Sequence, residues 1–152
     1  MIIVSACLCG INTRYDGKSN LNETTLKLLK EGKAVLVCPE QLGGMSTPRL
    51  PHEIVGGDGA GVLDGIAKVI SADGNDGTYA FLKGAYETLK IAKEINAEYA
   101  ILKAKSPSCG YGKIYNGSFS GEKISGNGVT AELLNRNGII VYTEEDIKDI
   151  DI

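Results

Sequence analysis

The sequence predicts an α/β protein, a Rossmann-like three-layer sandwich with a mostly parallel sheet of about four to five strands. Short apolar runs alternate with amphipathic helical segments along the chain. The runs are continuous rather than interrupted by polar residues, which is typical of parallel strands buried on both faces. At 152 residues and 43% apolar content, the chain has the size and composition of one domain, which we expect to span residues 1–152.

The first half of the chain is expected to hold two strands and one helix. Ile2–Ala6 (IIVSA) and Ala34–Val37 (AVLV) are apolar runs suited to buried strands. Between them, Glu23–Glu31 has helical periodicity and ends before Gly32, a typical C-terminal stop. Residues 39–61 contain three of the four prolines, so we expect a long loop there, and such loops often carry function.

The second half continues the alternation. Val62–Ser71 fits either an irregular strand or a short helix. Asp76–Ile95 repeats apolar residues at steps of three and four, which predicts the longest helix. The remaining expected segments are, in order, a strand at Tyr99–Lys103, a loop rich in glycine and serine at Ala104–Phe119, a helix at Val129–Asn137, a strand at Ile139–Tyr142 and a short closing helix at Glu144–Ile150.

Composition and charge exclude several classes of protein. A formal net charge of −3 argues against a broad basic face that would bind nucleic acid. No segment approaches the ~20 apolar residues of a membrane span, and the first residues lack the charged region of a signal peptide, so we expect a cytoplasmic protein. His52 is the one histidine, which excludes mechanisms that need two.

Three cysteines follow three of the predicted strands. Cys7 comes after the first strand, Cys38 after the second, and Cys109 in the loop that leaves the third. In parallel sheets ligands bind beyond the carboxyl ends of the strands, so we expect these thiols to converge at one edge. Three thiolates suit a soft metal centre, either zinc or an iron–sulfur cluster, with one coordination position open. The alternative is that they are ordinary small buried residues.

Polar residues close to these cysteines are candidates for catalysis or binding. Glu40, in the Cys-Pro-Glu segment, fits a general base or a solvated loop residue. Ser106 and Ser108 precede the third cysteine and fit hydrogen-bond donors to a substrate or cluster, or a serine turn. Asp16 follows the first cysteine pair and fits a pocket residue or an Asp-Gly turn.

Four segments carry a resemblance to a known family, in this order along the chain: SACLCGINTRYDG, CPEQLGGMSTPRLPHEI, LKAKSPSCG and NGVTAELLNRNGI. They are similar to the DUF523 family, whose members include thiouracil desulfurases that carry a [4Fe–4S] cluster. The resemblance runs from Val4 to Ile139, and the combination of CPEQLGG with a distant SPSCG is specific to that family. The chain resembles the family's short, single-domain form.

The resemblance implies roles for particular residues. The family's cluster ligands fall on Cys7, Cys38 and Cys109, and its proposed catalytic pair falls on Glu40 and Ser106. We further expect Asp16 and Ser108 to contact the substrate. Cys9 stands where relatives commonly have leucine, so the resemblance gives it no role, and a ligand swap between Cys7 and Cys9 stays open.

The activity that the resemblance implies is non-redox desulfuration. The thiocarbonyl sulfur of thiouracil, or of a related thionucleobase or thionucleoside, would be replaced by oxygen. The substrate sulfur would bind the iron that lacks a protein ligand, and Glu40 would activate the attacking water. The partner would then be a small thiolated pyrimidine. Because one iron lacks a protein ligand, protein prepared in air can lack the cluster.

Two other functions fit the residues alone. The first is a non-catalytic zinc or iron–sulfur module that binds a partner or senses oxidation, which would tolerate replacement of Glu40. The second is a metal-free enzyme with Cys109 as nucleophile. It is the weaker alternative because no histidine is placed to activate the thiol.

Overall fold

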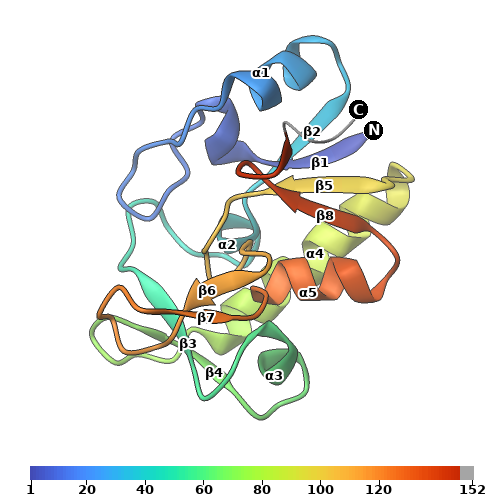
Figure 1. The fold of residues 1–152 in the computed structure, drawn as a ribbon. Helices are drawn as coiled ribbons and strands as arrows, with labels where there is room; N and C mark the ends of the chain where they lie inside the picture. Colours follow the sequence, from blue (N-terminus) through green and yellow to red (C-terminus); the bar gives the residue numbers. More distant parts are fainter. Residues whose placement is uncertain (148–152) are drawn as a thin grey trace.

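The computed structural model describes residues 1–147 and confirms the α/β fold, with all four predicted strands in one parallel sheet (Figure 1). The strand order is β2-β1-β5-β8. The strands are β1 (Ile2–Ser5), β2 (Ala34–Val37), β5 (Tyr99–Leu102) and β8 (Ile140–Thr143). In β1, Ile3 lies opposite Val35 on one side and Ala100 on the other. Because the strands are parallel, their carboxyl ends share one edge of the sheet.

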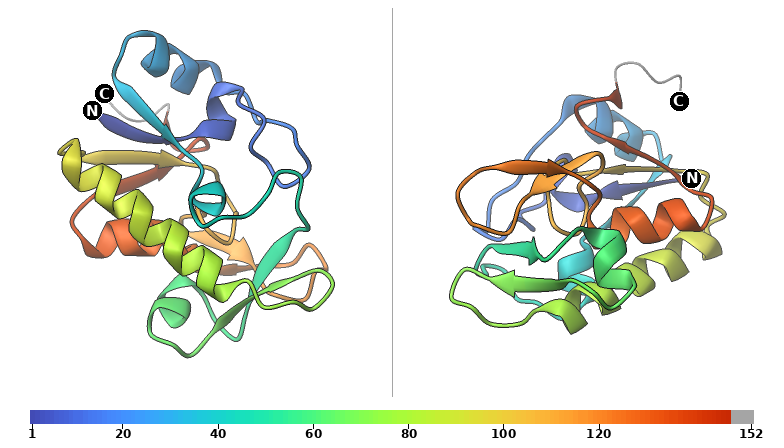
Figure 2. Two further views of the ribbon diagram at one scale, coloured as in Figure 1. Left: turned by 180° about the vertical axis from the view of Figure 1, so that it is seen from behind. Right: turned by 60° about the horizontal axis from the view of Figure 1, so that its bottom comes forward.

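Helices cover both faces of the sheet and form three layers, as predicted (Figure 1 and Figure 2). These helices are α1 (Glu23–Lys30) on one face, with α4 (Thr78–Glu94) and α5 (Val129–Arg136) on the other. Successive strand residues point to opposite faces, so Val4 packs in a cluster with Leu28 of α1, whereas Ile3 packs in a second cluster with Phe81 of α4. Full burial of such a side chain contributes about 1.5–3 kcal/mol, so both helical layers hold the sheet.

Two antiparallel hairpins lie beyond the carboxyl edge, and the first strand of each falls in a segment where the sequence predicted a loop (Figure 1). They pair β3 (His52–Val55) with β4 (Lys68–Ser71), and β6 (Lys113–Tyr115) with β7 (Lys123–Ser125). The loops expected at 39–61 and 104–119 are therefore wrong in part, because β3 (HEIV) and β6 (KIY) have too few consecutive apolar residues to be recognised as buried strands. The ambiguous stretch 62–71 holds both structures, the end of a helix and all of β4.

Three short helices complete the described chain. They are η1 (Ala6–Cys9), a 3-10 helix, and the α-helices α2 (Pro39–Leu42) and α3 (Gly59–Leu63). The α2 helix lies against α4 because residue 84 is glycine, where a Cβ atom would overlap the carbonyl oxygen of Pro39. This close approach fixes the segment that carries Cys38 and Glu40.

The predicted closing helix at 144–150 falls partly outside the described residues. Residues 144–146 form a turn instead, with the amide of Asp146 donating to the carbonyl of Thr143, and the rest of the prediction lies beyond residue 147. Within residues 1–147, no helix combines the length and the apolar character that crossing a membrane requires.

Candidate active site

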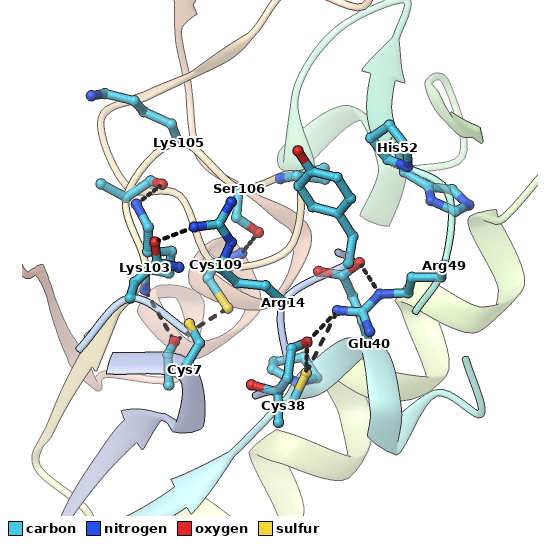
Figure 3. Close-up of a pocket in the computed structure, with 18 of the residues that line it drawn as sticks. Cys7, Arg14, Cys38, Glu40, Arg49, His52, Lys103, Lys105, Ser106 and Cys109 are labelled. Carbon is cyan, nitrogen blue, oxygen red and sulfur yellow. Dashed lines mark hydrogen bonds and ion pairs between the residues drawn. The ribbon is translucent and has the colours of Figure 1, made fainter. Parts of the chain in front are cut away.

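A cavity of about 590 Å³ lies at the carboxyl edge of the sheet (Figure 3). Its wall includes all three of the predicted cysteines, together with Glu40 and Ser106. These residues come from segments that follow β1, β2 and β5, so the convergence expected from the strand order is what the structure shows. The two hairpins contribute the opposite side through residues of β3 and of the β6–β7 turn.

Each cysteine is held by the structure that follows its strand. Cys7 lies in η1, which starts directly after β1, and Cys38 is the N-cap of α2, with a proline in the first turn. Cys109 lies in the turn after β5, where the Ser5 hydroxyl of β1 approaches its sulfur at 3.5 Å. Cys7 and Cys109 are buried, Cys38 is half-buried, and all of these thiols are free.

Burial dominates the acid–base properties of two of these thiols. Loss of solvation raises the pKa of Cys7, and it raises the pKa of Cys109 well above the ordinary thiol value. The nearby Cys38 and Cys7 sulfurs raise the pKa of Cys109 further, because thiolates at short distance repel one another. The thiols of Cys7 and Cys109 are therefore protonated in the metal-free protein, and a bound metal centre would have to displace their protons.

The donor chemistry fits an iron–sulfur cluster. The cavity wall offers three soft sulfur donors. His52 is already engaged, because its ring centroid lies 5.3 Å from that of Phe81 and its Nδ1 pairs with the Leu50 carbonyl. Among residues 1–147, no three Cys, His, Asp or Glu side chains are close enough to share a single metal ion. In a four-iron cluster each thiolate binds a different iron, so the ligands need not meet around one ion.

Glu40 is fixed by an arginine that the sequence analysis did not place in the site. Arg49 lines the cavity with its side chain only 6% exposed, and its Nε donates to Oε1 of Glu40 at 3.1 Å. The same guanidinium donates to the Thr13 carbonyl and the Thr47 hydroxyl, both at 2.8 Å, and lies 4.0 Å from the sulfur of Cys38 (Figure 3). One arginine thus ties the candidate base to a candidate ligand.

Ser106 is oriented by the backbone that follows it. Its hydroxyl oxygen accepts hydrogen bonds from the amides of Ser108, at 3.1 Å, and Cys109, at 3.0 Å. Because the oxygen already accepts twice, the hydroxyl proton is available to donate. The side chain lines the cavity, so this proton can be directed at a bound molecule.

Asp16 and Ser108 are not among the residues that line the cavity. The Ser108 hydroxyl is fully buried and pairs with Thr130 at 2.8 Å, so it supports the turn that carries Cys109. Asp16 forms an ion pair with Arg14 at 2.8 Å, and it is Arg14 that reaches the cavity. The predicted contacts of Asp16 and Ser108 with substrate stay predictions.

Cys7 and Cys9 differ in their access to the cavity. Both pack in the apolar cluster that contains Leu28 of α1, but Cys7 also lines the cavity, whereas Cys9 does not. Burial raises the pKa of the Cys9 thiol, as it raises that of Cys7. The structure thus favours Cys7 over Cys9 as the sulfur available to a cavity-bound group.

Comparison with known proteins agrees with this geometry. The family model of 2-thiouracil desulfurase matches residues 2–146. YbbK, an uncharacterised protein of Bacillus subtilis (strain 168), is 55% identical to this chain over 150 residues, which cover 99% of each sequence. The solved structure of a [4Fe-4S]-dependent thiouracil desulfidase, TudS (DUF523Vcz), has a TM-score of 0.86 and 41% identity, covering 97% of this chain and 93% of its own.

These matches confirm the resemblance to DUF523, and both span nearly the full sequence. The fold agrees as well, since the likeness to TudS takes in 97% of the chain. The chain therefore belongs to the 2-thiouracil desulfurase family.

Proposed function

We propose that this protein is a [4Fe–4S]-dependent desulfurase that replaces the thiocarbonyl sulfur of thiouracil, or of a related thionucleobase or thionucleoside, by oxygen. The observation that carries the proposal is the meeting of three thiols, the Glu40 carboxylate and the Ser106 hydroxyl donor on the wall of one cavity. Membership of the family and the name of the TudS structure support the same activity.

Cys7, Cys38 and Cys109 would hold the cluster. When bound, a cluster with three protein ligands supplies a Lewis-acidic iron suited to a soft sulfur donor. The Ser5 hydroxyl beside Cys109 and the Arg49 guanidinium beside Cys38 can each donate toward a ligating sulfur, which offsets part of the negative charge that three thiolates bring into a buried site.

Glu40 is the group placed to activate water. Arg49 bonds Oε1, and within residues 1–147 the second carboxylate oxygen has no hydrogen-bond partner, so it is free to accept a proton from water. The water oxygen bonds to the thiocarbonyl carbon as the carbon–sulfur bond breaks, and the products are the oxo compound and hydrogen sulfide. Ser106 would donate its hydroxyl proton in a hydrogen bond that orients the substrate.

The test is anaerobic cluster reconstitution followed by measurement of sulfide released from 2-thiouracil and 4-thiouracil. We expect Glu40→Gln to lower turnover about 10²- to 10⁴-fold while the visible absorbance of the cluster is unchanged, because the variant keeps the site but loses the base. Glu87→Gln is the matched control, since Glu87 is a half-buried residue of α4 outside the cavity wall whose carboxylate, within residues 1–147, bonds only Lys90.

The cysteines give a second readout, which is cluster content. Serine in place of Cys7, Cys38 or Cys109 should abolish stable cluster binding, whereas Cys9→Ser should retain it. Loss of the cluster from Cys9→Ser would contradict the ligand assignment. A fully loaded protein that releases no sulfide from either compound would refute the desulfurase and favour a non-catalytic metal-binding module. A Glu40→Gln variant with wild-type turnover would instead refute the role of Glu40 as the base.

A further inference from the structure

The tip of the β6–β7 hairpin forms part of the cavity wall. Tyr115, Phe119 and Gly121 all line the cavity, together with the three cysteines. Phe119 is one of two phenylalanines in the sequence, and the other, Phe81, is a core residue.

The backbone of Phe119 adopts a conformation that a bulky residue rarely takes. Its φ angle is +56°, and among residues 1–147 only Asn96 and Lys105 share a positive φ without being glycine. Of these three, Lys105 and Phe119 line the cavity. A left-handed backbone at a large side chain is unfavourable and persists only where surrounding contacts enforce it, which happens most often at functional sites.

The contacts that enforce it come from β3. The Glu53 carboxylate, which is buried, accepts hydrogen bonds at one oxygen from the amides of Gly117, at 2.9 Å, and Phe119, at 3.2 Å. Gly117 also has a positive φ, and a Cβ there would collide with the Ile54 carbonyl oxygen. The hairpin tip is therefore clamped against β3, and the clamp sets the direction of the Phe119 side chain.

The ring of Phe119 differs from the tyrosine rings of the cavity in having no stacking partner among the described residues. The Tyr15 ring lies under the Arg14 guanidinium, and the Tyr115 ring lies under the Lys123 ammonium. Within the described residues, no aromatic or cationic partner stacks on Phe119, and the residue is 39% exposed. The chain thus maintains a strained backbone and leaves an apolar ring bare at the cavity, which glycine or asparagine at this position would avoid.

We propose that Phe119 is a specificity-determining residue whose ring forms an aromatic face for the planar heterocycle of the substrate. This rests on the proposed function and deepens it. An aromatic face attracts a flat, conjugated ring by stacking and tolerates its substituents, so it selects cyclic thiocarbonyl compounds over acyclic thioamides. The reacting sulfur would then point toward the cysteine side while the ring lies against the hairpin tip.

The test compares the cluster-loaded wild type with four variants, using the KM for 2-thiouracil and the calorimetric Kd for uracil. Phe119→Leu keeps apolar area but loses the ring, and we expect both constants to rise about fivefold or more, by analogy with the loss of a base-stacking aromatic. Phe119→Tyr keeps the ring and should stay within about twofold. Phe119→Gly should raise both constants at least as much as Phe119→Leu without lowering the unfolding temperature, because it relieves the left-handed strain.

Tyr79→Leu is the matched control, because Tyr79 is an 80% exposed aromatic residue of α4 outside the cavity. It should leave both constants unchanged. If the wild type turns over 2-thiouracil and both constants are unchanged in Phe119→Leu and Phe119→Gly, the role given to Phe119 is overturned and the proposed function stands. An equal rise in Tyr79→Leu would also overturn it. A loaded wild type that neither turns over 2-thiouracil nor binds uracil would overturn the proposed function, and the inference falls with it.

Discussion

Replacement of Arg49 by glutamine tests how the site is organised. The guanidinium is almost fully enclosed, and it links Glu40 of α2 to the loop after β1 through the Thr13 carbonyl. Glutamine has no charge and too short a reach to make both bonds. The variant would leave the Glu40 carboxylate, whose side chain is 17% exposed, beside the cavity without its cation.

The magnitude follows from that burial. Breaking a fully buried ion pair costs about 3–5 kcal/mol, and hydrogen bonds to charged groups contribute about 1.5–3 kcal/mol each. Because the Glu40 side chain is partly exposed, solvent screens part of this interaction energy, and we expect the free energy of unfolding to fall by about 2–3 kcal/mol. For a chain of this length each 1 kcal/mol lowers Tm by about 2–4 °C, which gives a fall of about 4–12 °C. Turnover should fall about 10²-fold, because a misplaced base loses its alignment with the water.

The assay is thermal unfolding of the metal-free protein, together with sulfide release by the reconstituted one. Arg136→Gln is the control. Arg136 makes hydrogen bonds to Asp64 and Glu132, its side chain is 39% exposed, and it does not line the cavity. Such exposed pairs contribute about 0–1 kcal/mol. If Arg49→Gln lowers Tm no more than Arg136→Gln and retains full turnover, the role given to Arg49 is wrong.

Two further variants separate support of the site from contact with substrate. Gly84→Ala should lower Tm by about 5 °C or more and reduce activity. The added methyl group would force α2 away from α4 and so move the segment that carries Cys38 and Glu40. Thermal unfolding measures the first effect and turnover measures the second. Ser108→Ala should destabilise the protein by about 1–2 kcal/mol through its lost bond to Thr130, and an unchanged KM in this variant would contradict the predicted contact of Ser108 with substrate. A raised KM in Ser108→Ala would instead show that Ser108 contacts the substrate.

The parallel sheet was predictable because its strands are buried on both faces. Runs such as IIVS of β1 and AVLV of β2 are apolar without interruption, and that signal needs no knowledge of the partner strand. The hairpins were not predictable in the same way. β7 is exposed along its whole length, so its residues carry no apolar pattern, and its pairing with β6 depends on a turn between them.

The same distinction separates the site residues that could be predicted from those that could not. Placing Cys7, Cys38 and Cys109 at one edge needed only strand order, and the cavity wall includes all three. Arg49 and Phe119 reach the cavity from segments whose position depends on tertiary contacts. The signal for Arg49 was its place in the loop after the Cys-Pro-Glu segment, and the signal for Phe119 was no more than an aromatic residue between glycines and serines.

The two interpretations of the cysteines, as buried core residues and as metal ligands, are compatible in this fold. Cys109 belongs to the apolar cluster under α4 and α5, and Cys7 belongs to the cluster under α1. Because their burial raises the pKa of both thiols, these side chains are uncharged in the metal-free protein and pack as small apolar groups. The sheet and its helices can therefore form before any cluster arrives. It follows that cysteine-to-serine variants should lose the cluster at a modest cost in stability, whereas Gly84→Ala should damage the fold itself.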